Sequence, residues 1–225
     1  MSYSALVARE GLSESHRLLV DAVPPGSRTL DVGCAGGYVA VALRERRCSV
    51  LGVEADPTAA REARMRGVEV VDGPVDDPKV QVALRAAGPF DALVCGDVLE
   101  HLVDPWRVLA VLADLLRPAG TAAISLPNAA HWTVRRALVR GRFPREDHGV
   151  FDRTHLRWLT LADARALVAG AGLKTVRESY TEAPLPLEAR IALPSWVRSL
   201  AVRRLPTLFA LQVVLVAQRP PADAR

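Results

Sequence analysis

Short apolar runs alternate with amphipathic stretches along most of the chain. The apolar runs predict strands at residues 29–32, 50–53, 68–71, 90–95 and 121–126. The run 90–95 is apolar at nearly every position, as expected for a strand that is buried on both faces of a parallel sheet. Two further strands are predicted at residues 173–180 and 209–217.

Helical periodicity fills the intervals between these runs. Residues 37–47 and 57–66 are predicted helices. The helix after residues 90–95 begins with Asp104 as its N-cap and Pro105 in its first turn. Its apolar stripe is Val108, Leu112, Leu115 and Leu116. Pro118 and Gly120 are predicted to end it. Thr160 and Asp163 resemble a capping box that starts another helix, which Gly172 ends.

This alternation predicts an α/β fold: a doubly wound, mostly parallel seven-stranded sheet with helices on both faces. A chain of 225 residues fits one domain, so residues 1–225 are predicted to form a single unit. Two stretches break the alternation. Residues 128–159 are rich in His, Arg and Trp, and residues 183–207 hold four prolines. Either stretch could cover a bound substrate or serve as packing.

Composition and charge restrict the partners, the metals and the cellular location that we expect. The formal net charge is +4 and no run of five like charges occurs, which is typical of a solvated surface, so no nucleic-acid partner is expected. Cys34, Cys48 and Cys95 form no metal-ligand or CxxC pattern, so no metal is predicted. Buried, reduced cysteines and the lack of a signal-peptide pattern favour a cytoplasmic location. The apolar run 208–217 is too short to span a bilayer as a helix.

A glycine-rich loop follows the first predicted strand. It reads Asp31-Val32-Gly33-Cys34-Ala35-Gly36-Gly37 and stands at the carboxyl end of that strand, where doubly wound sheets bind ligands. Glycines there let the backbone approach a ligand closely, although they also make tight turns. Glu54 ends the second strand about 20 residues later, where an acid accepts hydrogen bonds from ribose hydroxyls. The loop and the acid together predict a ribose-containing ligand.

The details of the loop disfavour a nicotinamide enzyme. Ala35 and Tyr38 occupy the second and third glycine positions of the dinucleotide fingerprint G-x-G-x-x-G. Asp31 is an anion, which does not suit a pyrophosphate but does suit a ligand that carries an ammonium group. S-adenosylmethionine has a ribose, an amino group and a sulfonium, and it has no phosphate.

The sequence resembles the class I S-adenosylmethionine-dependent methyltransferases over roughly residues 15–180. Residues 30–37 look like their motif I, and the fourth-strand and strand-five motifs match at residues 90–102 and 116–120. Residues 125–132 and 151–157 look like a bacterial subgroup related to the ubiquinone-biosynthesis O-methyltransferases. Members of that subgroup often accompany enzymes that build cell-surface glycans and natural products.

The resemblance implies S-adenosylmethionine as cofactor and assigns roles to individual residues. Asp31, Gly33 and Ala35 would line the methionine and ribose, with Gly36 in the same loop. Ala35 replaces a commoner glycine, and we expect the loop's backbone donors to stay available. The other implied cofactor-binding residues are Glu54 at the ribose, Ala55, Asp72 and Gly73 at the adenine, and Cys95, Gly96 and Asp97 near the sulfonium.

The predicted function is methyl transfer to a small molecule or a glycan, with O-methylation expected first. N- or C-methylation of a natural-product or quinone-type acceptor, or cofactor binding without catalysis, remain alternatives. A methyltransferase that acts on nucleic-acid bases is disfavoured, because no aromatic residue that could stack on a flipped base follows the fourth strand. The apolar and arginine-rich residues 183–207 suggest a helix packed on the sheet edge, or, less favoured, contact with a membrane or a lipid-linked acceptor. The oligomeric state stays open.

A hydroxyl acceptor must lose a proton, which a histidine or a carboxylate can take. His131, just past the fifth strand, and His155, near Asp152, are the predicted catalytic residues. His101 is as suited to packing beside the cofactor as to catalysis. His16 is predicted at the surface or at a gate, and His148 in a solvated loop.

Overall fold

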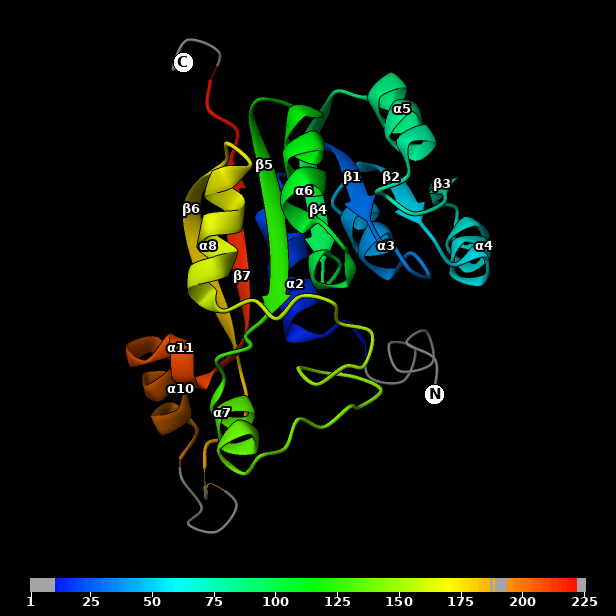
Figure 1. Cartoon of the computed structure of the whole chain (residues 1–225). Helices are drawn as coiled ribbons and strands as arrows, with labels where there is room; N and C mark the ends of the chain where they lie inside the picture. Colours follow the sequence, from blue (N-terminus) through cyan, green and yellow to red (C-terminus); the bar gives the residue numbers. More distant parts are fainter. Residues whose placement is uncertain (1–10, 187, 189–193, 222–225) are drawn as a thin grey trace.

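The computed structural model describes residues 11–186, 188 and 194–221. One sheet holds seven strands in the order β3-β2-β1-β4-β5-β7-β6 (Figure 1). The pairs among β1 to β5 are parallel, and β7 runs antiparallel to both β5 and β6. The strands are β1 (Arg28–Val32), β2 (Ser49–Glu54), β3 (Glu69–Asp72), β4 (Phe90–Gly96), β5 (Leu116–Pro127), β6 (Lys174–Glu182) and β7 (Ala210–Gln218). The predicted doubly wound, mostly parallel sheet is confirmed.

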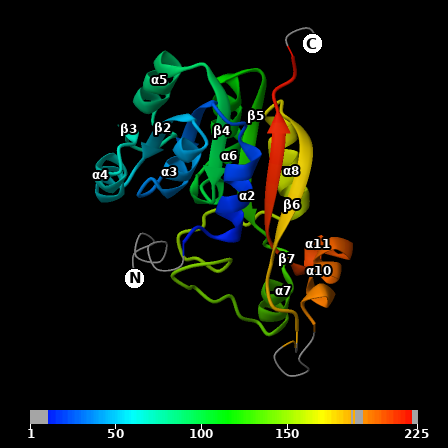
Figure 2. The same ribbon diagram turned by 180° about the vertical axis from the view of Figure 1, so that it is seen from behind.

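Helices cover both faces of the sheet. They are α2 (Glu14–Ala22), α3 (Tyr38–Glu45), α4 (Pro57–Met65), α5 (Pro78–Ala87), α6 (Pro105–Asp114), α7 (Trp132–Val139), α8 (Leu161–Gly170), α10 (Ser195–Arg204) and α11 (Pro206–Phe209), with a 3₁₀ turn η1 (Leu99–His101). Helices α6 and α8 lie in front of the sheet in Figure 1, and α2 lies in front of it in Figure 2.

Strand β4 shows why both faces are apolar. Leu93 and Cys95 point to the face that α6 and α8 cover, whereas Ala92 and Val94 pack with α2 and α3 on the other. All four side chains are at most 1% exposed. A central strand that is covered on both faces needs apolar residues at every position, which explains the continuous apolar run.

The helix starts follow from short polar caps. Asp104 caps α6 by accepting from the Arg107 backbone N–H, and Pro105 follows in the first turn. Thr160 and Asp163 form the predicted capping box of α8.

The end of α6 differs from the prediction. The helix stops at Asp114, and Leu116 already belongs to β5, where it pairs with Phe90. Leu115 and Leu116 are therefore not part of the helical stripe, and Pro118 and Gly120 lie within the strand. The leucines are buried in either geometry, so their hydrophobicity does not reveal which element they belong to.

The two stretches outside the alternation contain helices. Residues 128–159 form α7 and a long loop that runs below the carboxyl ends of the strands in Figure 1. Residues 183–207 include α10, which contacts β6. In the proposed apolar stripe of that stretch, Trp196, Leu200 and Leu205 are exposed, and Leu187 and Ile191 lie outside the described residues. Within the described part of the chain, no helix is long and apolar enough to cross a membrane.

Candidate active site

A cavity of about 640 Å³ lies at the carboxyl edge of the sheet. Its wall comes from the loop after β1, the end of β4 with η1, the start of α2, and the loop that follows α7. Of the predicted site residues, the wall contains Asp31, Gly33, Ala35, Gly96, Asp97 and His155. Segments that are far apart in sequence thus meet where a doubly wound sheet binds its ligand.

The glycine loop closes tightly over the end of β1. Gly33 has a φ of +65°, and a Cβ there would lie 2.5 Å from Cγ2 of Val98, so only glycine fits without rearrangement. Ala35 adopts a φ of +45°, in the same left-handed region. Position 35 therefore has a backbone geometry that glycine prefers, and Ala35 adopts it with some backbone strain.

The loop's N–H groups bind protein atoms. Gly33 and Cys34 both donate to the Val53 carbonyl oxygen, at 2.8 and 3.1 Å. The Ala35 N–H donates to Oε2 of Glu54 at 2.8 Å. The expectation that these donors stay available is therefore wrong for these three residues, because the loop is tied to β2 through them.

Glu54 joins two loops through one carboxylate. Its Oε2 accepts from Ala35, and its Oε1 accepts from the Asp56 backbone N–H at 2.8 Å. Each carboxylate oxygen has a second lone pair, with which it can accept from a ribose hydroxyl. Glu54 is not part of the cavity wall; it stands at the end of β2, paired with Asp72 at the end of β3.

The remaining predicted cofactor residues lie outside the cavity wall. Ala55 and Gly73 follow β2 and β3, and the exposed Asp72 accepts from Arg64 at 2.6 Å. Gly36 belongs to the loop, but it does not line the cavity either. The Cys95 side chain is fully buried within the core. The adenine and ribose assignments concern residues at the ends of the neighbouring strands β2 and β3, and they stay predictions.

Asp31 is a buried acid with an unused acceptor. Its side chain lines the cavity, the residue is 2% exposed, and Oδ2 has no hydrogen-bond partner among the described residues. Burial and the nearby Glu54 raise its pKa to about 7. Because an unpaired buried carboxylate is costly, a ligand ammonium at this point would be stabilising. The amino group of S-adenosylmethionine fits that requirement.

Asp97 is fixed from two strands. Its Oδ1 accepts from the Ser125 hydroxyl of β5 at 2.7 Å, and its Oδ2 accepts from Nε2 of Gln212 of β7 at 2.8 Å. Asp97 has a φ of +53°, an uncommon backbone geometry for this residue type. The two side-chain bonds hold its carboxylate at the cavity wall.

The turn η1 and the loop before α8 are bound together. The Glu100 carbonyl oxygen accepts from the N–H groups of Leu156 and Arg157, both at 2.9 Å. Nε of Arg157 donates to the Val103 carbonyl oxygen at 2.9 Å. These bonds bring His155 beside His101, although the two residues are distant in sequence.

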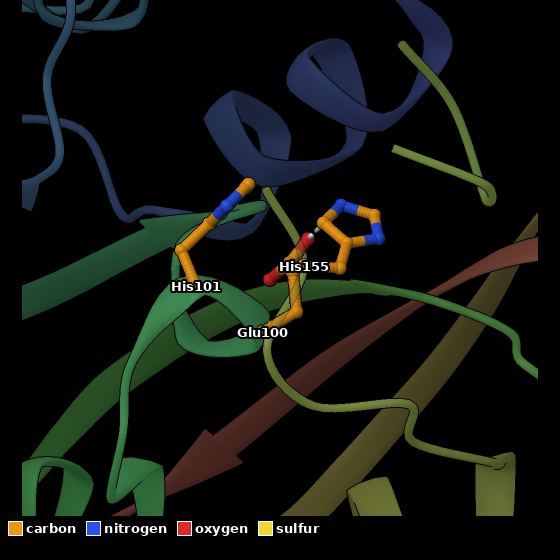
Figure 3. Close-up of side chains that lie close together, drawn as sticks. All are labelled: Glu100, His101 and His155. Carbon is orange, nitrogen blue, oxygen red and sulfur yellow. Dashed lines mark ion pairs between the residues drawn. The ribbon is translucent and has the colours of Figure 1, made fainter. Parts of the chain in front are cut away.

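Figure 3 shows Glu100, His101 and His155 converging on one corner of the cavity. The two imidazole rings meet edge to face with centroids 4.9 Å apart, and Nε2 of His155 lies 3.9 Å from Oε1 of Glu100. We call these three residues the histidine corner. Their possible ligand atoms all lie within 4.8 Å of one another, a donor set that a divalent cation could use.

Burial favours the neutral forms of two members of this corner. It raises the pKa of Glu100 well above its ordinary value, with a further contribution from Asp97. Burial, and then the neighbouring His101, lower the pKa of His155. Both carboxyl oxygens of Glu100 are enclosed and have no hydrogen-bond partner among the described residues.

His131 lies just past β5, as expected, but its ring has a different task. It caps α7: Nδ1 lies 2.8 Å from Oγ1 of Thr133 and faces the Thr133 backbone N–H. The residue is 1% exposed and does not belong to the cavity wall, and burial lowers its pKa to about 4. The structure therefore gives no support to His131 as a neighbour of the acceptor.

Sequence reasoning gave too little weight to the other histidines. His101, His16 and His148 all line the cavity. His16 stands at the start of α2 and is 7% exposed, so it faces the site rather than the surface. The Asp152-x-Thr154 spacing is typical of a local turn, but it does not indicate that this turn lies beside His101, which is distant in sequence.

Comparison with known proteins agrees with this geometry. A family model described as a methyltransferase domain matches residues 7–178. The chain is 30% identical over 160 residues to a ubiquinone biosynthesis O-methyltransferase of Xanthomonas axonopodis pv. citri, an alignment that covers 67% of this chain and 64% of the relative. A second such enzyme, from Xanthomonas campestris pv. campestris, is 36% identical over 53% of this chain and 51% of its own length. The chain thus matches between half and two thirds of these relatives.

Solved structures show the same fold. Magnesium protoporphyrin IX methyltransferase from Synechocystis, with bound S-adenosylhomocysteine, aligns with a TM-score of 0.64 and 16% identity over 97% of this chain and 88% of that one. A methyltransferase from Archaeoglobus fulgidus aligns with a TM-score of 0.63 and 15% identity over 96% and 100%. The family match, the loop at β1 and the unpaired Asp31 lead to one conclusion: the chain belongs to the class I S-adenosylmethionine-dependent methyltransferases.

Proposed function

We propose that this enzyme methylates a hydroxyl oxygen of a small organic acceptor, such as a phenol, a hydroquinone or a sugar. The observation that carries the proposal is the histidine corner, which shares one cavity with Asp31 and Gly33. A neutral hydroxyl is a poor nucleophile until its proton is removed, whereas an amine attacks without a base. Proton-accepting groups beside the methyl donor are therefore most useful for oxygen acceptors.

The chain's own residues divide the cavity into two ends. When bound, S-adenosylmethionine supplies a methyl carbon that its sulfonium activates. Asp31 holds the amino group, and the fixed carboxylate of Asp97 lines the same cavity as the histidine corner. His155 borders the acceptor, as the sequence predicted, and its buried ring excludes water from that side.

The curated relatives support oxygen over nitrogen or carbon, since they are named as O-methyltransferases. Their names also refer to ubiquinone biosynthesis, which makes a phenolic or quinone-type acceptor the first to test. A glycan or a lipid-linked sugar remains within the same chemical class, because its hydroxyl needs the same proton removal.

The test is methyl transfer from labelled S-adenosylmethionine to matched acceptors. We would offer phenol, catechol, hydroquinone and sugar hydroxyls beside the corresponding amines, and locate the label by mass spectrometry. Label on oxygen is the expected result. Transfer to amines alone, or to carbon alone, would contradict the proposal while leaving the assignment to the methyltransferase family intact.

A further inference from the structure

Within the proposed O-methylation, on which this inference rests, we infer that His101 takes the acceptor's proton, and that Thr154 and Asp152 hold its ring in the tautomer that can do so. His101 would then be a catalytic residue, and Thr154 and Asp152 positioning residues. The inference follows from a chain of three hydrogen-bonded groups that connects η1 with the loop before α8.

The chain begins at a carboxylate. Oδ1 of Asp152 accepts from the Thr154 hydroxyl at 2.6 Å and from the Thr154 backbone N–H at 2.8 Å. Burial works against ionisation, but these two hydrogen bonds, together with the nearby His155 and His101, hold the pKa of Asp152 below its ordinary value. Asp152 is therefore an acceptor only, and the single hydroxyl proton of Thr154 is committed to it.

That commitment fixes the proton on His101. Nδ1 of His101 lies 3.1 Å from the Thr154 hydroxyl oxygen and 3.3 Å from the Thr154 carbonyl oxygen. The carbonyl can only accept, and the hydroxyl has already given its proton to Asp152. Nδ1 must therefore be the donor and carry the hydrogen, which leaves the lone pair of the neutral ring on Nε2.

Nε2 is free and reachable. Among the described residues it has no hydrogen-bond partner, and it is not one of the enclosed polar atoms. His101 lines the cavity, so Nε2 can meet an acceptor hydroxyl there. His155 differs, because its Nδ1 is enclosed and its Nε2 faces Glu100. Of the two rings in the histidine corner, His101 has the lone pair that is open to the cavity.

The step balances. The acceptor hydroxyl passes its proton to Nε2 of His101 while its oxygen forms a bond to the methyl carbon. The bond between that carbon and sulfur breaks, and its electron pair stays on sulfur. The resulting imidazolium still donates from Nδ1 to Thr154, and the charge of Asp152 behind Thr154 stabilises it. The arrangement resembles the orienting role of the acid in a catalytic triad, with a hydroxyl inserted between acid and imidazole.

The structure supplies a matched control pair. His131 and Thr133 also form a histidine–threonine contact, at 2.8 Å, but His131 does not line the cavity. Thr133→Val removes the hydroxyl from that pair, just as Thr154→Val removes it from the pair in the cavity. His101→Asn is the matched variant at the base, because its amide can still donate to Thr154 but offers no basic nitrogen.

The experiment compares two acceptors of different acidity in one assay. An ordinary phenol needs a base at neutral pH, whereas a nitrophenol that carries two nitro groups is already almost fully ionised. We expect His101→Asn and His101→Ala to lower turnover of the phenol by about 10²–10⁴-fold and that of the nitrophenol by about tenfold or less. Thr154→Val should lower phenol turnover by a smaller factor, Thr154→Ser should restore it, and Thr133→Val should leave it unchanged.

Two further readouts separate chemistry from folding. Binding of S-adenosylhomocysteine, measured by calorimetry, should stay within about twofold of the original in every variant, since none of these residues contacts the cofactor in the proposed arrangement. Nitrogen-15 NMR of labelled histidines should show His101 protonated at Nδ1, and Thr154→Val, which keeps only the backbone carbonyl as an acceptor, should increase the fraction of the other tautomer.

The outcomes are distinguishable. Equal losses with both acceptors, or weakened cofactor binding, would mean that His101 is structural and overturn the inference. Full activity of His101→Asn with the phenol would also overturn it and leave the proposed O-methylation standing. If the unmodified enzyme methylates no hydroxyl at all, the proposed function fails first.

Discussion

Two histidine–threonine pairs in this enzyme look alike locally and differ in what surrounds them. In the first pair, Thr154 fixes the tautomer of His101 and leaves the opposite nitrogen open to the cavity. In the second pair, Thr133 contacts His131, and the opposite nitrogen is enclosed and has no hydrogen-bond partner in the described part of the chain. The same contact therefore leaves Nε2 of His101 able to accept a proton from the cavity, whereas it leaves Nε2 of His131 buried at a cost in free energy.

The enclosed ring of His131 should make the stability of the folded enzyme depend on pH. Burial lowers the pKa of His131 from 6.5 to about 4, so between these values the unfolded chain binds a proton that the folded chain does not. Stability conferred by the neutral ring is therefore complete above pH 6.5 and is lost as the pH falls toward 4, by about 2–3 kcal/mol in all.

His131→Asn tests this, because asparagine keeps a capping acceptor and does not titrate. Urea unfolding of both proteins from pH 7 to pH 4 should show a flatter profile for the variant. Parallel profiles would mean that His131 titrates normally and that its burial has no energetic consequence.

A second prediction extends the comparison to the other end of the cavity, where Asp31 also has an unpaired buried atom. If that atom awaits the ligand's ammonium, Asp31→Asn should weaken binding of S-adenosylhomocysteine by about 1.5–3 kcal/mol. The pKa of about 7 means that the unmodified enzyme binds best above pH 7. Its affinity should fall by about tenfold for each pH unit below 7. Calorimetry between pH 6 and pH 8 measures both effects, and equal pH dependence in the variant would remove Asp31 from this role.

The smallest expected effect is a loss of stability at neutral pH when the His131 side chain is removed. His131→Ala removes the N-cap of α7 and should reduce the free energy of unfolding by about 0.5–2 kcal/mol. Turnover and cofactor affinity of the folded protein should not change, because His131 lies outside the cavity wall. Thermal unfolding and a methyl-transfer assay on the same preparation give the two numbers. A large loss of turnover without loss of stability would reverse the assignment of the two pairs.

The central strands were predictable because burial on both faces leaves a nearly unbroken apolar run. The predicted run 90–95 matches β4, and Glu54 ends β2 as expected. Helix α5 was not predicted, although Asp77 and Pro78 form the same kind of start as Asp104 and Pro105. Its buried apolar positions Val80 and Leu84 alone give a weak periodic signal.

The candidate site was harder to predict because it depends on contacts between distant residues. The loop motif placed Asp31 and Gly33 correctly on the cavity wall, since their position is fixed by one strand end. His101 and Thr154 meet only because the Glu100 carbonyl binds the loop before α8. His131 lies after β5 as predicted, but its side chain caps α7 and does not line the cavity. That residues 1–225 form one domain remains a prediction.

The double backbone bond at Glu100 also bears on how this enzyme can be re-engineered. It anchors residues 154–157 to η1, while the side chains of residues 145–148 are exposed and reach the cavity wall at His148. Residues 145–148 are joined to the segment that carries Asp152, because Glu146 exchanges backbone hydrogen bonds with Phe151 and Arg153, and Asp147 forms an ion pair with Arg153. A library randomised at His148 alone would therefore sample new acceptor shapes while the bonds that hold the segment of Asp152 are kept, so the substrate range can be varied without moving the proton-transfer groups.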